Sequence, residues 1–289
     1  MNEVEPIIID EATFLYDHCA LPPLPSVVYR MRDLMLSRDV NLSEISDLIK
    51  IDPGLMAQLL KIVNSAYYSF PREIEEIHFA VAYLGINEVY RIVLSLSVIN
   101  TLDLNHSAEF KKLWIHSNYT ALAAKFVTER CAPYLPAEKL WSAAMLHDIG
   151  KLVYLKFFPD HFQFITHYCE THGTLFSHAE KKFSLPSSAF MGKLLCDRWR
   201  LPGRIRDACQ HHTFDDLKTV SGNTAEDDFI RMIIIGNLMA VLAENRLGAA
   251  LKEQIATEVQ TSLDLTPGEF SILLEDVVGF RGKVSQLAL

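Results

Sequence analysis

The sequence has no long run of lysine or arginine, and its 289 residues carry a formal net charge of −9. A protein that binds duplex nucleic acid normally presents a basic face to the phosphates. The charge balance therefore argues against nucleic acid as the main partner. Arg198, Arg200, Arg204 and Arg206 form a local exception that could meet phosphate, although a solvated helix face explains them more simply.

The sequence also lacks paired cysteines and long hydrophobic segments. Its five cysteines are scattered, odd in number and without a Cys-x-x-Cys pair, which is typical of idle thiols in a reducing compartment. The most apolar stretches, YRIVLSLSVI and MIIIGNLMAVLA, are too short to span a bilayer. The acidic N-terminus, MNEVEPIIIDEATF, has no signal-peptide profile. We therefore expect a cytoplasmic protein with no membrane partner.

No strand-like run, hairpin signal or glycine-rich phosphate loop is evident, whereas a helical period dominates the chain. The segment 25–36, PSVVYRMRDLML, places its apolar residues on one stripe, which predicts an amphipathic helix. Asp52 followed by Pro53 predicts the start of another helix. Gly85 predicts a left-handed helix end, and Asn87 predicts the start of the next helix. We expect a compact all-α fold.

The second half of the chain carries further helical segments. We expect helices over 107–131, 136–158, 159–171, 187–199 and 202–211. The acidic, polar stretch 213–228 predicts an exposed loop, and a largely buried helix should follow it. Thr266 and Glu269 have the spacing of a capping box at the start of a C-terminal helix. A soft boundary near 103–108 separates helices with ordinary packing signals from those that carry histidines in apolar surroundings.

Several polar residues lie in the apolar helices of this second half. They are His116, His147, Asp148, His211, His212 and Asn237. Imidazole together with carboxylate suits Fe, Mn, Zn or Ni better than Ca. Taken singly, such a histidine is more often a hydrogen-bonded core residue, Asp148 could pair with Lys151, and the histidine pair could simply end a helix. Because the residues are spread over several helices, the set indicates part of a metal site.

Two groups of motifs resemble a known family. The front half carries LPPLPSVVYRM, IDPGLMAQLLKIVNSAYY and AVAYLGINEVYRIVL, and the back half carries LWIHS, AAMLHDIGKLVY and LLCDRWRLPGRIRDACQHH. On these motifs the chain resembles the HDOD family, the HD-related output domains of bacterial signalling, over about residues 20–245. The resemblance implies an HD-like fold of two packed helical lobes, over 1–106 and 107–247, with the helices of 248–289 packed on them.

The resemblance also implies what the site should contain. Active HD phosphohydrolases hold one metal with a His, a His-Asp pair and a later Asp, and they add further His residues for a second metal. The residues that match are His116, His147, Asp148, His211 and His212, whereas Ser188 replaces an expected His and Asn237 replaces the closing Asp. Two-metal hydrolysis needs more anionic ligands than this degenerate set supplies. The prediction is therefore either no metal or one divalent Fe, Mn, Ni or Zn ion.

Three functions remain open on this reading. The incomplete ligand set and the resemblance favour a non-catalytic output or interaction module that acts through signalling protein partners. The apolar residues after about 248 allow these helices either to cover the core or to form a homodimer. The first alternative is a metal-dependent phosphohydrolase of a nucleotide or cyclic nucleotide, in which Lys151 contacts phosphate. The second alternative is a sensor pocket for a small phosphorylated ligand, without turnover.

Overall fold

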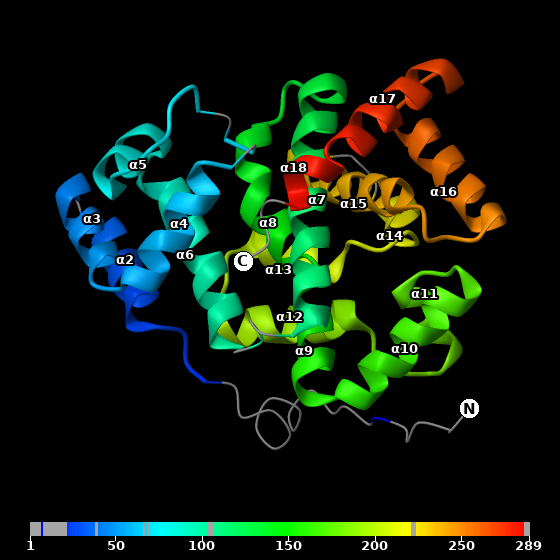
Figure 1. The fold of residues 1–289 in the computed structure, drawn as a ribbon, viewed down its shortest axis with the longest axis horizontal. Coiled ribbons are helices and arrows are strands. Elements are labelled where there is room, and N and C mark those ends of the chain that lie inside the picture. Colours follow the sequence, from blue (N-terminus) through cyan, green and yellow to red (C-terminus); the bar gives the residue numbers. More distant parts are fainter. Residues whose placement is uncertain are drawn as a thin grey trace.

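The computed structural model describes Ile7 and residues 22–37, 40–65, 67–68, 70–102, 104, 107–220 and 224–285. This part of the chain is helical and contains no strand, as the sequence predicts. The first lobe, on the blue-to-cyan side of Figure 1, consists of α2 (Ser26–Met35), α3 (Leu42–Lys50), α4 (Pro53–Val63), α5 (Ile77–Leu84) and α6 (Ile86–Thr101).

The second lobe is arranged around the long helix α7 (Ala108–Cys131), which runs through the middle of the molecule (Figure 1). The helices that follow are η2 (Ala137–Leu140, a 3₁₀ helix), α8 (Trp141–Leu146), α9 (Ile149–Phe157), α10 (Pro159–His172), α11 (Phe176–Lys182), α12 (Ser188–Trp199), α13 (Gly203–Gln210), α14 (Asp216–Thr219) and α15 (Ala225–Glu244). The last helices are α16 (Ala249–Ser262), α17 (Pro267–Gly279) and α18 (Arg281–Ser285).

Two predicted helix starts have the expected side-chain caps. The Asp52 carboxylate accepts a hydrogen bond from the backbone N–H of Leu55, which satisfies one of the free amides in the first turn of α4. Thr266 and Glu269 form the predicted capping box at α17. These caps confirm that the local signals read from the sequence determine where these helices begin.

Other boundaries differ from the prediction. Gly85 has a positive φ of 80°, but its ψ of 157° is not the left-handed helical value, and it ends α5 and caps α6 at once. The prediction that Asn87 caps α6 is therefore wrong by two residues. The segment 213–228 is not one exposed loop, because it contains the short helix α14, whose Leu217 is buried.

The largest departure lies over 136–158, which is not a single helix. The chain forms η2 and α8, breaks at His147 and Asp148, and resumes as α9. The change of direction brings the backbone of Gly150 against α12, so closely that a Cβ at residue 150 would lie 1.8 Å from the Ser188 carbonyl oxygen. Packing between helices therefore overrides the continuous helical pattern of the sequence.

Hydrogen bonds join the two lobes. The Tyr67 hydroxyl donates to the carbonyls of Ala137 and Glu138, at 3.1 and 3.2 Å. The Trp199 indole donates to the carbonyl of Pro22 at 3.2 Å. None of the described helices could cross a membrane alone by length and apolarity, and α5 with α6 meets those criteria only as a pair bent by 118°.

Candidate functional site

Three imidazoles from separate segments converge on one carboxylate. His147 and Asp148 lie at the break between α8 and α9, His116 lies on α7, and His212 follows the end of α13. The Nε2 atoms of His116, His147 and His212 lie 3.7, 3.3 and 3.1 Å from the nearest carboxylate oxygen of Asp148. All four residues belong to the candidate set predicted from the sequence, and the structure brings them together.

Two of the imidazoles are held by their other ring nitrogen. Nδ1 of His147 faces the Ala144 carbonyl at 2.6 Å, and Nδ1 of His212 faces the Cys209 carbonyl at 2.9 Å. A carbonyl only accepts hydrogen bonds, so each Nδ1 carries a proton and donates. The other ring nitrogen, Nε2, therefore faces the Asp148 carboxylate in both residues.

The charges at Asp148 favour a cation in this position. Burial lowers the pKa of His147 below its usual range, and the neighbouring Asp148 only partly offsets this, so the ring is neutral at pH 7. Burial acts to raise the pKa of Asp148, but Lys151 and His147 outweigh it and hold that pKa well below its usual range. The Lys151 ammonium donates to Asp148 Oδ2 at 2.7 Å.

His116 is held by residues of α15. Its Nδ1 lies 3.0 Å from Glu244 Oε1, and its Nε2 lies 2.9 Å from Asn237 Oδ1. Burial acts to lower the pKa of His116, but the Glu244 and Asp148 carboxylates outweigh it and raise that pKa. The Asn237 amide also donates from Nδ2 to the His212 carbonyl at 2.9 Å, so both ends of this side chain are used.

The cluster fits one divalent ion, provided that His116 Nε2 gives up its hydrogen bond to Asn237 Oδ1. One ligand atom each from His116, His147 and Asp148 lies within 4.8 Å of the others, and His212 provides a further imidazole beside them. His147 Nε2 and Asp148 Oδ1 are buried and make no hydrogen bond within the described residues, a costly arrangement that a cation between them would relieve. A bound ion would supply Lewis acidity toward a water or phosphoryl oxygen.

Two other candidate residues lie apart from this cluster. The His211 side chain is 41% exposed and its Nδ1 lies 3.6 Å from Asp216 Oδ1, so it is not among the converging imidazoles. Ser188 is buried at the start of α12, where its backbone N–H donates to Glu180 Oε1 at 2.7 Å. Of the predicted histidine pair, His212 therefore lies at Asp148, whereas His211 lies near Asp216.

Two carboxylates near the cluster, Glu244 and Glu180, are not among the residues predicted from the sequence. Glu244 follows Asn237 by seven residues, a spacing that places both on one face of a helix. This spacing could have marked Glu244 as a candidate site residue. Glu180 is buried, and burial raises its pKa to about 7 although the hydrogen bonds from Ser188 lower it. Glu180 lies outside any periodic pattern of polar residues in apolar helices, so no comparable sequence signal points to it.

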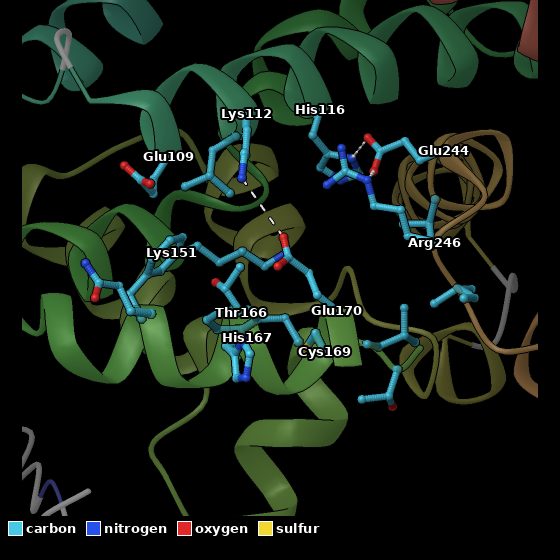
Figure 2. A pocket seen from close by; sticks show the side chains of 18 of the residues that line it. Glu109, Lys112, His116, Lys151, Thr166, His167, Cys169, Glu170, Glu244 and Arg246 are labelled. Carbon is cyan, nitrogen blue, oxygen red and sulfur yellow. Dashed lines mark hydrogen bonds and ion pairs between the residues drawn. The ribbon is translucent and has the colours of Figure 1, made fainter. Parts of the chain in front are cut away.

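A pocket of about 420 Å³ opens beside the cluster. His116 and Lys151 reach it from α7 and α9, and Figure 2 shows Glu244 and Arg246 beside His116. Lys112 and Glu170 face each other across the pocket at 4.0 Å (Figure 2). Most of the remaining lining is apolar, from Leu113, Ile115, Phe162, Leu175, Phe176, Val241 and Leu247.

The comparison with protein families agrees with the fold. A model of the HDOD domain family matches residues 21–214. The chain belongs to the HDOD family. An uncharacterized protein of Treponema pallidum (strain Nichols) is 25% identical over 202 aligned positions, and the alignment covers 66% of this chain. The HDOD chain spans 37% of the length of that relative.

Solved structures have the same fold. A Geobacter sulfurreducens HDOD domain protein of unknown function has a TM-score of 0.71 at 23% identity, over 96% of this chain and 97% of its own. A Marinobacter aquaeolei VT8 protein, provisionally named for signal transduction, has a TM-score of 0.70 at 18% identity, over 99% of this chain and 62% of its own. A Shewanella amazonensis SB2B protein, provisionally named a phosphohydrolase, has a TM-score of 0.69 at 19% identity, over 96% of this chain and 97% of its own. At these identities the similarity establishes the HDOD fold alone.

Proposed function

We propose that this chain is a signal-transduction output module whose HD-type site holds at most one divalent ion and does not hydrolyse a phosphodiester. The observation that carries the proposal is the Asn237 amide, which accepts from His116 and donates to the His212 carbonyl. An aspartate in its place would add a negative ligand but could not donate to that carbonyl. The amide therefore suits a hydrogen-bonded cluster better than a hydrolytic metal centre.

The position of Ser188 supports the same proposal. Its backbone amide is used by Glu180, and a serine hydroxyl is a poor ligand for Fe, Mn, Ni or Zn. Two-metal catalysis places two ions about 3.5–4 Å apart around one nucleophile. The imidazoles at Asp148 supply ligands for one ion only. The proposed site therefore binds neither a second ion nor a nucleophile that bridges two ions.

A second candidate function is a metal-dependent phosphohydrolase. It is favoured by Lys151, which contacts Asp148 and also lines the pocket, where its ammonium could bind a phosphate. A sensor for a small phosphorylated ligand would use the same pocket and the same lysine without turnover. Both alternatives place the ligand over His116 and Lys151.

Metal content and phosphodiesterase activity test the proposal on the untagged full chain. We expect at most one equivalent of Fe, Mn, Ni or Zn by plasma mass spectrometry, lost in His147→Ala, and no hydrolysis of bis(p-nitrophenyl) phosphate. His211→Ala is the matched control, because this exposed histidine lies outside the cluster and its loss should leave metal content unchanged. Hydrolysis by the wild type that His147→Ala abolishes would contradict the proposal.

The proposed output is contact with protein partners or with a second copy of the chain. Ile272 and Val278 of α17 are 59% and 41% exposed, which places apolar side chains on the outer face of the C-terminal helices. Light scattering of the wild type and of Ile272→Glu tests the homodimer. A monomeric wild type would leave heterologous signalling proteins as the partners to be sought.

A further inference from the structure

A second cavity, of about 330 Å³, lies between the two lobes and away from the metal cluster. We call it the arginine cavity, after the residues that define it: Tyr29 and Arg32 of α2, and Arg198, Trp199 and Arg200 at the end of α12. Its size falls in the range of small-molecule sites. None of the described residues that line it is acidic, although the whole chain carries a net charge of −9.

One buried aromatic residue and several arginines line the cavity. Trp199 is 6% exposed, and its indole N–H donates to the Pro22 carbonyl, so this side chain joins the two lobes at the cavity. The Arg32 guanidinium lies 5.5 Å from the centre of the Tyr29 ring. Its ion pair with Asp33 is long, at 3.8 Å, and 70% of the Asp33 side chain is exposed, so this pair neutralises little of the Arg32 charge.

The backbone of Arg200 supplies an independent observation. This residue has φ 53° and ψ 46°, the left-handed conformation that usually selects glycine or asparagine at a helix end. An arginine there is strained, and its side chain lines the cavity. The neighbouring Arg204, in contrast, lies outside the cavity and makes two hydrogen bonds to Glu226, at 2.6 and 2.8 Å.

From these features we infer that the arginine cavity binds a small molecule that carries a diphosphate group. A guanidinium group has planar, paired donors that match phosphate oxygens, and the arginines that line the cavity together suit an anion with more than one negative charge. A long polyanion is disfavoured, because the chain as a whole is acidic, with a net charge of −9. Such a ligand would contact α2 and α12 together and so hold the two lobes in their present arrangement. The inference does not depend on the metal cluster.

Inorganic pyrophosphate is the probe for the first experiment. Calorimetric titration of the metal-free full chain at low salt should give saturable binding of one anion per chain. Proton–nitrogen spectra report the location, because the chain has three tryptophans, and only the indole signal of Trp199 should shift. Absence of saturable binding, or a shift of the Trp114 or Trp141 indole in place of Trp199, would overturn the inference.

Matched arginine variants test the residues. Arg32→Gln and Arg200→Gln should each weaken pyrophosphate binding at least tenfold, whereas Arg204→Gln should change it less than twofold. Equal losses in all three variants would mean non-specific charge attraction and would refute the site. Arg200→Gly separates binding from folding, because removing the strain should raise the melting temperature while binding is lost. A glycine variant that binds as well as the wild type would also refute it.

Discussion

The packing of α7 against α15 can be tested directly, because it positions His116 of α7 beside Asn237 and Glu244 of α15. At Gly236 a Cβ would lie 2.5 Å from the Cβ of Ala124 and 2.7 Å from its backbone nitrogen. Ordinary carbon contacts begin near 3.4 Å, so Gly236→Ala must separate the helices by roughly 1 Å. Overpacking of this kind costs about 1–3 kcal/mol, which exceeds the gain of up to about 1 kcal/mol from alanine in a helix.

The site should respond to the same substitution. The hydrogen bonds from His116 to Asn237 and Glu244 are 2.9 and 3.0 Å long, and an added separation near 1 Å would break them. Urea unfolding measures the stability, and Gly268→Ala is the control, because no described atom lies within 4 Å of a Cβ at that glycine. A Gly236→Ala chain as stable as the wild type, with unchanged histidine NMR signals, would refute this account of the crossing.

Three further predictions concern stability. Because the folded pKa of Glu180 is about 7 and the unfolded one is lower, wild-type stability should fall as pH rises from 5 to 7 and stay level above. Glu180→Gln should remove that fall and gain up to about 3 kcal/mol at pH 8, and an unchanged pH profile would contradict this. Asp52→Ala should cost about 1 kcal/mol through loss of the α4 cap, whereas exposed Asp47→Ala should cost almost nothing. Arg200→Gly should gain about 1 kcal/mol in urea unfolding, and a loss would exclude backbone strain at this position.

Much of the fold could be predicted because its signals are local. A cap such as Asp52 acts on the next turn of the same helix, and an apolar stripe such as that of α2 depends only on helical period. The break at His147 could not be predicted in this way. It depends on how closely α9 approaches α12, which involves residues about 40 positions apart and leaves no periodic trace.

In the candidate site, too, some features could be predicted from the sequence and others could not. The residues His116, His147, Asp148 and His212 stand out as polar side chains in apolar segments, and the structure places them together. His211 is adjacent to His212 in the sequence, but the chain leaves α13 at that point and the two side chains face different surroundings. Pairing in sequence could not distinguish them, because the direction of a side chain outside a helix depends on the local turn.

The close approach at Gly150 bears on how the segment HDIGK should be used in surveys of genomes. Only hydrogen occupies the space between this residue and the Ser188 carbonyl, so a larger side chain would force α9 and α12 apart whether or not a metal is bound. The glycine of this pentapeptide is thus a requirement of architecture. A chain that no longer binds metal or catalyses a reaction would still need this glycine for the packing of the two helices. A search by this pattern would therefore collect proteins that share a fold and not a reaction.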